Sequence, residues 1–121
     1  MISECQIKKI SEIDKSKLEV FYKKNFPFRY KTLTDNWQWW YNCKNINQHP
    51  IVLLHRDDVI GQAAHTPVSL KFNGKKINAF WFQDFVIDEK FSRRGLGKFL
   101  CLEWMKLTKN CITICSPLWL K

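Results

Sequence analysis

The chain has 121 residues, of which 45% are hydrophobic and 15% aromatic, so it is long enough for a single domain with an apolar core. Its 20 basic and 11 acidic residues give a formal charge of +9, which favours anionic partners without choosing among nucleic acid, an acidic membrane surface and a phosphorylated cofactor. No apolar run reaches the roughly 18 residues of a membrane span, and no signal-peptide segment is present, so we expect a cytoplasmic protein with no membrane partner.

The five cysteines are odd in number and include no C-x-x-C pair, so neither a disulfide framework nor a zinc site is predicted. Cys101 falls within a predicted helix, and Cys111 and Cys115 fall in an apolar strand-like run. Cysteine at such positions is usually a small buried hydrophobe. We therefore predict reduced thiols in the core.

The first part of the chain predicts one strand and two helices. Residues 5–10 form the strand, and the following segment, which ends before Pro27, repeats apolar side chains at helical spacing: Leu18, Phe21 and Tyr22. A second short helix is predicted to follow Thr34 or Asp35, and it carries Trp37, Trp39, Trp40 and Tyr41. We predict that these aromatic residues pack against a sheet rather than stack on nucleic-acid bases.

The middle of the chain predicts a meander of three antiparallel strands. Residues 51–54 form an apolar run, residues 56–58 a turn, and Val59 begins the next strand. Asn73-Gly74 is a strong two-residue turn signal, after which residues 75–87 return as the third strand. Neither face of that strand is polar, which predicts a central strand covered on both sides.

The most informative segment is residues 85–100, where an apolar strand runs into a basic glycine turn and then an amphipathic helix. Gly95 and Gly97 lack the side chains that would keep the backbone away from a phosphate. The helix beginning near Leu96 presents free N–H groups and the positive end of its dipole. Three cations add charge to this predicted anion site: Arg93, Arg94 and Lys98.

The helix after the glycine turn is predicted to end around Lys109-Asn110. Residues 111–115 then form a further strand, and a strand, helix, strand connection favours parallel pairing with the long strand before it.

This order of elements resembles the N-terminal two-thirds of the GCN5-related N-acetyltransferase (GNAT) fold. Residues 92–97, Ser-Arg-Arg-Gly-Leu-Gly, match the acetyl-CoA loop of that family: Arg or Gln, two variable residues, Gly, one variable residue, then Gly or Ala. Ser92 stands where the family usually has Arg or Gln. The resemblance implies a single α/β (α+β) domain over residues 1–121. Its mixed sheet, β-α-α-β-β-β-α-β, would lack the C-terminal helix and the last two strands of the family.

The resemblance also implies an acyltransferase domain that binds acetyl-CoA (coenzyme A) and transfers an acetyl group to an amine acceptor. Main-chain groups of the fourth strand, at Phe85, Val86 and Ile87, would contact the pantetheine arm. The pyrophosphate would lie on the loop, whose residues are Arg93, Arg94, Gly95, Leu96, Gly97 and Lys98. No metal is implied.

Direct acetyl transfer requires a base, or a water relay to one, to take a proton from the acceptor amine. Asp84 is the candidate base, because it lies in a strongly apolar strand just before the pantetheine contacts, and a carboxylate buried without a partner is a stronger base than one in water. A structural aspartate bonded to the backbone is the alternative. Glu89 and the histidines His55 and His65 are weaker candidates.

The family fold normally continues with a helix, often carrying the tyrosine that acts as acid, and two more strands. Only residues 116–121 follow the last predicted strand, which is therefore expected at an apolar edge of the sheet. Three explanations remain open: a fragment of a longer acetyltransferase, a sheet completed by another copy or chain, and a protein that binds coenzyme A without turnover. The abrupt apolar end favours the fragment. Activity and the class of acceptor both stay open, because the walls that select the acceptor lie mostly in the absent part.

A function of a different class, a basic nucleic-acid-binding module, would explain the charge and the tryptophans. It would not explain the predicted strand, glycine turn and helix of residues 85–100, so nucleic acid is not expected as a partner.

Overall fold

The structure is a computed structural model that describes residues 2–108 and 111–115. Its helices and strands follow one another as β1 (Cys5–Lys9), α1 (Lys15–Asn25), α2 (Tyr30–Trp40), β2 (Ile51–His55), β3 (Asp58–Phe72), β4 (Lys75–Ile87), α3 (Leu96–Leu107) and β5 (Ile112–Ile114). The predicted helix end at Lys109-Asn110 and the tail of residues 116–121 lie outside the described residues. Within the described residues, no helix combines the length and the apolar character that a bilayer span requires.

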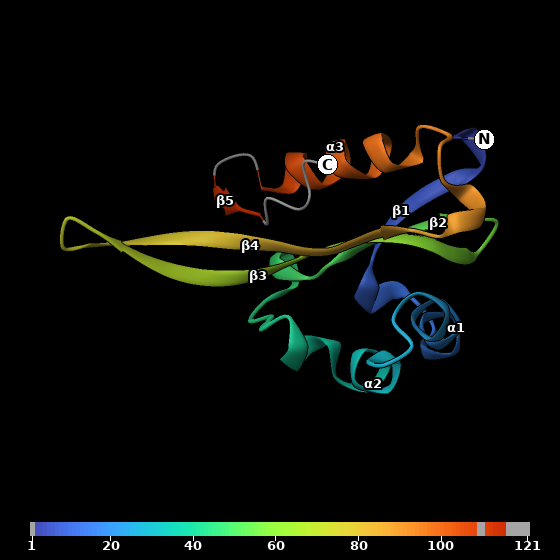
Figure 1. Cartoon of the computed structure of the whole chain (residues 1–121), viewed down its shortest axis with the longest axis horizontal. Helices are drawn as coiled ribbons and strands as arrows, with labels where there is room; N and C mark the ends of the chain where they lie inside the picture. Colours follow the sequence, from blue (N-terminus) through green and yellow to red (C-terminus); the bar gives the residue numbers. More distant parts are fainter. Residues whose placement is uncertain (1, 109–110, 116–121) are drawn as a thin grey trace.

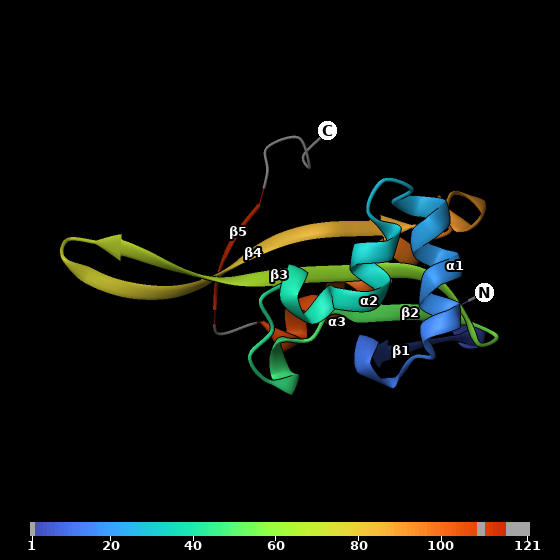
Figure 2. The same cartoon turned by 90° about the horizontal axis from the view of Figure 1, so that it is seen from below.

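The strands form one mixed sheet in the order β1-β2-β3-β4-β5. All neighbouring strands are antiparallel except β4 and β5, which are parallel, as predicted. The two helices α1 and α2 lie on one face of the sheet and α3 lies on the other (Figures 1 and 2). The sheet therefore separates two apolar cores, one on each face.

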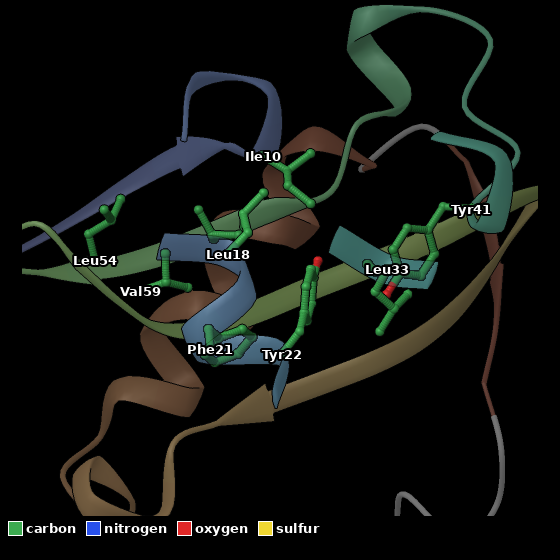
Figure 3. Packing of buried hydrophobic residues seen from close by; sticks show 10 residues of the cluster. Ile10, Leu18, Phe21, Tyr22, Leu33, Tyr41, Leu54 and Val59 are labelled. Carbon is green, nitrogen blue, oxygen red and sulfur yellow. The ribbon is translucent and has the colours of Figure 1, made fainter. Parts of the chain in front are cut away.

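The core on the α1 and α2 face is built from both helices and from one face of the sheet. Its buried side chains are Ile10, Leu18, Phe21, Tyr22, Leu33, Tyr41, Val52, Leu54, Val59 and Ala64. Figure 3 shows Tyr22 and Tyr41 standing among these apolar side chains. Both tyrosines are fully buried, so each hydroxyl must find a partner within the protein.

The β3–β4 hairpin projects beyond the helices at one end of the sheet (Figure 1). Its turn is the predicted one: Asn73 and Gly74 adopt φ values of 50° and 76°, the left-handed pair of a two-residue hairpin turn. The pairing continues from Phe72 opposite Lys75 back to Gly61 opposite Ile87. The meander predicted from the sequence is confirmed.

The predicted start of the second helix is wrong, because α2 begins at Tyr30. Threonines flank Leu33, and β-branched residues disfavour a helix. Leu33 is nevertheless fully buried in the core, and this burial overrides the local propensity. The dihedrals of Asn36 are not helical (φ −137°, ψ 35°), so α2 is kinked close to the point where the prediction placed its beginning.

The prediction that the third meander strand is covered on both faces is also wrong. Only Ala79 and Phe82 of β4 are buried, and Trp81 is 41% exposed. The most buried strand is β2, followed by the first half of β3. The apolar residues of β4 that the helices do not cover lie on the projecting hairpin, where an uninterrupted apolar pattern does not mean burial.

The predicted burial of the thiols fails for two cysteines, since Cys111 and Cys115 are exposed next to the short edge strand β5. Cys101 is half-buried. The apolar run around β5 thus lies at an edge of the described sheet.

On the α3 face, His65 of β3 is buried and accepts a hydrogen bond from the indole N–H of Trp104, with 2.8 Å between Nδ1 and Nε1. Its other ring nitrogen, Nε2, is buried and has no hydrogen-bond partner among the described residues. Burial lowers the pKa of His65 to about 4. The imidazole is therefore neutral in the folded protein, and its contact with Trp104 joins β3 to α3.

We expect this histidine to destabilise the fold as the pH falls. The unfolded chain takes up a proton near pH 6.5 and the folded chain only near pH 4, so the unfolded state gains protons first and stability is lost across that window. The difference between the pKa of His65 in the unfolded and the folded chain corresponds to about 3 kcal/mol in the free energy of unfolding. Urea unfolding between pH 7 and pH 4 measures it, with His65→Gln as the variant that removes the titration and keeps an acceptor for Trp104. Equal pH slopes for the two proteins would contradict this account.

Candidate functional site

A β-bulge divides β4 near its C-terminal end. Gln62 pairs with Val86 and Ala64 pairs with Gln83, so two residues of β4, Asp84 and Phe85, lie opposite one residue of β3. Asp84 adopts a left-handed backbone conformation with φ 52°. This conformation costs an L-residue about 1 kcal/mol, so surrounding contacts must hold it in place.

Those contacts form a polar network on the α1 and α2 face, made of Tyr22, Arg29, Tyr41, Gln62 and Asp84. The Tyr22 hydroxyl donates to the Gln62 side-chain oxygen. The Gln62 amide nitrogen donates to the Tyr41 hydroxyl at 3.0 Å and to the Asp84 carbonyl at 3.2 Å. The Tyr41 hydroxyl in turn donates to Asp84 Oδ2 at 2.8 Å. The hydroxyl groups of Tyr22 and Tyr41 and the side-chain amide of Gln62 thus all form hydrogen bonds within the network.

Arg29 closes the network from the turn before α2. Its guanidinium donates two hydrogen bonds to the Asp84 carboxylate, at 3.1 Å and 3.0 Å. The same guanidinium lies over the rings of Phe26 and Trp40, with 4.7 Å and 5.1 Å to the ring centroids. Phe26 at the end of α1 and Trp40 of α2 therefore hold the arginine in the fixed geometry that a bidentate carboxylate contact needs.

The environment keeps every donor of this network protonated. Burial raises the pKa of Tyr22 and of Tyr41 well above the usual range of a phenol. The hydrogen bond to Asp84 raises the pKa of Arg29. Both phenols and the guanidinium therefore keep their protons at neutral pH.

The carboxylate of Asp84 is half-buried and has three hydrogen-bond donors, so it is not the partnerless carboxylate on which the predicted catalytic role depended. The alternative of a structural aspartate is closer to this geometry, although its partners are side chains rather than backbone groups. The catalytic role stays a prediction.

The glycine loop lies at the other end of the same strand segment. Gly95 caps α3 in a left-handed conformation with φ 78°, and Arg93 before it has φ 62°. Leu96, Gly97 and Lys98 form the first turn of α3, whose N–H groups have no intrahelical acceptor, since the first such bond runs from the Phe99 N–H to the Gly95 carbonyl. The free N–H groups on which the predicted anion site depends are therefore present, and anion binding by them stays a prediction.

Gly97 places this loop against β4. A Cβ atom at Gly97 would meet Ile87 Cγ1 and Phe85 Cζ at 3.8 Å, which is ordinary contact distance, and a Cβ at Gly95 would meet nothing within 4 Å. The packing of the protein alone would therefore tolerate a side chain at position 97, so packing does not explain why this residue is glycine. Because Gly97 has no side chain, space is left between the start of α3 and the end of β4.

The three predicted cations of the loop, Arg93, Arg94 and Lys98, are all exposed. The guanidinium of Arg94 lies 5.7 Å from the ring centroid of Phe91. Within residues 2–108 and 111–115, none of the three forms an ion pair. Their positive charge is therefore available to an anion at the loop.

The predicted pantetheine contacts, Phe85, Val86 and Ile87, form the end of β4 that leads into the loop. The pairing of β4 with β5 covers Ala79 to Trp81 and does not reach Val86 or Ile87. On the opposite side, Gly61 of β3 allows a close approach, because a Cβ there would lie 2.7 Å from Ile87 Cδ1 and 3.2 Å from the Val86 carbonyl oxygen. The end of β4 is thus fixed by β3, and it lies beyond the described pairing of β4 with β5.

The structure brings Asp84, the end of β4 and the glycine loop into one continuous segment. His55 lies beside the loop, with 5.0 Å between its ring centroid and that of Phe91, and it lines the same hollow as Arg94, whereas His65 lies away from the loop. His55 Nε2 lies 3.0 Å from Glu4 Oε2, and His65 lies on the α3 face. Sequence analysis missed Arg29, Gln62 and Gly61. A signal existed for Gln62, since it is a lone polar residue in the apolar segment from Val59 to Ala64, and a buried polar side chain needs a partner on a neighbouring element.

Comparisons with known proteins support the fold. No protein-family model and no curated protein matches the sequence. Among solved structures, a GNAT family acetyltransferase from Staphylococcus aureus is 21% identical, with a TM-score of 0.64 over 92% of this chain and 82% of that one. Glucosamine-6-phosphate N-acetyltransferase from Arabidopsis thaliana is 17% identical, with a TM-score of 0.62 over 93% of this chain and 81% of that one. An aminoglycoside acetyltransferase from an uncultured soil metagenomic sample is 16% identical, with a TM-score of 0.64 over 94% and 78%. The chain therefore has the GNAT fold.

We expect Asp84→Asn to lower the stability of the fold, whether or not Asp84 has a catalytic role. An asparagine cannot accept the bidentate contact, so Arg29 and Tyr41 each lose a charged acceptor, and the free energy of unfolding should fall by about 2 kcal/mol. Urea unfolding measures the loss. Glu89→Gln, an exposed carboxylate of the loop, is the matched control and should leave stability unchanged. An Asp84→Asn protein as stable as the parent would show that the network does not hold the bulge.

Proposed function

We propose that this chain is an acyltransferase domain that binds acetyl-CoA and transfers its acyl group to an amine. The observation that carries the proposal is the junction of the α3 N-terminus with the bulged end of β4, through Gly97 against Phe85 and Ile87. The acetyltransferase fold of the solved neighbours supports it. We place this activity in the cytoplasm.

The loop fits a pyrophosphate by three independent features. The N–H groups of Leu96, Gly97 and Lys98 are free of helical acceptors, and the positive end of the α3 dipole lies at the same point. The side chains of Arg93, Arg94 and Lys98 add charge. The space beside Gly97 lets a phosphate approach the backbone closely.

The end of β4 fits an extended amide-bearing arm. Within the described residues, the pairing of β5 with β4 ends at Trp81 and does not reach Val86 or Ile87, so an extended ligand could add to this edge as a strand does. The side chains on both faces are packed, Val86 against the α1 and α2 core and Ile87 against the α3 core. When bound, acetyl-CoA supplies an acyl group activated as a thioester.

The bulge then determines which atoms of the chain meet the acyl end. Asp84 interrupts the regular alternation of β4 at the point where an arm running from the loop along Ile87, Val86 and Phe85 would end. We propose that Asp84 serves first as a positioning residue through Arg29, Tyr41 and Gln62. If it also takes the proton of the acceptor amine, Arg29→Lys, which keeps a cation, should retain more turnover than Asp84→Asn.

Calorimetric titration with coenzyme A tests the proposal. The parent protein should bind it, and Gly97→Trp should weaken binding by more than about tenfold, or about 1.4 kcal/mol, because an indole fills the space beside Phe85 and Ile87. Phe28→Trp, at a fully exposed position, is the control that should leave affinity unchanged. A folded parent protein that does not bind coenzyme A, but does bind duplex DNA with a steep salt dependence, would overturn the assignment in favour of a nucleic-acid-binding module.

A further inference from the structure

A hollow lies on the α2 face of the sheet, beside the bulge. It has a volume of about 400 Å³ and lies between the C-terminal half of α2 and the neighbouring segments of β3 and β4. Its lining residues are Trp39, Trp40, Thr66, Val68, Trp81 and Gln83. We call it the tryptophan groove.

The tryptophans of this groove are not explained by packing alone. Trp37 and Trp40 pack against the core, as the sequence predicted for the aromatic cluster. Trp39, in contrast, is 75% exposed, and Trp81 of β4 is 41% exposed. The rings of Trp39 and Trp40 meet edge to face with 6.3 Å between their centroids. Large ring surfaces from two separate elements are therefore left open to one hollow, which is a costly arrangement without a ligand.

The groove begins next to the proposed acyl position, so the inference rests on the proposed function. Gln83 directly precedes Asp84, and Trp81 lies two residues further along the same face of β4, opposite Thr66. Ile87 pairs with Gly61 and Gln83 pairs with Ala64, so from the glycine loop to Gln83 the strand advances by three residues of β3, or about 10 Å. An arm that starts at the loop and follows β4 would thus bring its far end to the mouth of the groove.

The side chains that line the groove limit the class of ligand that it can bind. No lining residue carries a charge. Gln83 donates a hydrogen bond to Thr66, and the other polar groups of the lining are the indole N–H donors of the tryptophans. Arg29 and Asp84, at the bulge next to Gln83, form an ion pair with each other. A polyamine or amino sugar needs several carboxylates or hydrogen-bond partners, whereas flat apolar groups stack on indole rings and an ammonium group is attracted to their faces.

We propose that the tryptophan groove binds the acceptor of the acyl transfer, and that this acceptor is a primary amine carried on an aromatic body. The aromatic body lies against Trp39 and Trp81, and the amine points along β4 toward Asp84. The groove selects by ring stacking and cation–π attraction rather than by ion pairs.

Intrinsic fluorescence and calorimetry on the full chain test this with three probes: 2-phenylethylamine, spermidine and glucosamine, each with and without coenzyme A. 2-Phenylethylamine should bind about tenfold more tightly than the other two, since one aromatic pair contributes about that factor. Trp39→Ala and Trp81→Ala should each weaken it by about fivefold or more and leave coenzyme A affinity unchanged. Phe72→Ala, an exposed aromatic of the same hairpin outside the groove, is the matched control.

Two results would overturn the inference: equal or tighter binding of spermidine or glucosamine, or 2-phenylethylamine binding that neither tryptophan variant changes. Because Trp39 is largely exposed, Trp39→Ala tests the groove even where Trp81→Ala weakens the fold. Loss of coenzyme A binding with intact, tryptophan-dependent amine binding would overturn the proposed acyl transfer and support the groove as an amine site. The reverse pattern would overturn only the groove.

Discussion

The rest of the structure depends on one constraint: Asp84 has a left-handed backbone conformation near the C-terminal end of β4, and a buried network of hydrogen bonds must hold it there. Tyr22, Gln62 and Tyr41 are fully buried, and each uses its hydrogen-bonding groups within the network that ends at Asp84 and Arg29. Removing any one member leaves a partner unsatisfied, at about 1–3 kcal/mol each. Such a network is stable in an apolar core only when it is complete, so the five residues act as one unit.

The bulge held by this unit divides β4 into two regions with different surroundings. From Phe85 to Ile87 the strand is packed on both faces and leads into the glycine loop, with Gly61 allowing β3 to approach closely. Before the bulge, Gln83 and Trp81 face the open groove beneath α2. A single local distortion therefore separates the surface proposed for the cofactor from the surface proposed for the acceptor, and it aligns both along one strand.

The sequence predicted the parts of the fold that depend on local signals. The Asn73-Gly74 turn, the strand leading into Gly95 and Gly97, and the parallel β5 follow from short-range patterns, and the structure confirms them. The start of α2 and the burial of β4 were predicted wrongly because they depend on which tertiary surface covers each segment. The contact between Arg29 and Asp84 joins residues 55 positions apart, and no periodicity in the sequence encodes such a pairing.

The central claim is that the bulge, the end of β4 and the glycine loop form one ligand-binding surface. Amide-resolved NMR during a coenzyme A titration tests it most directly. We expect the largest shift changes at the amides of Leu96, Gly97 and Lys98, continuing through Ile87 and Val86 to Asp84, with the projecting hairpin around Asn73 unchanged. Changes confined to the loop, or to residues outside this segment, would contradict the claim that one strand carries the ligand from the helix terminus to the bulge.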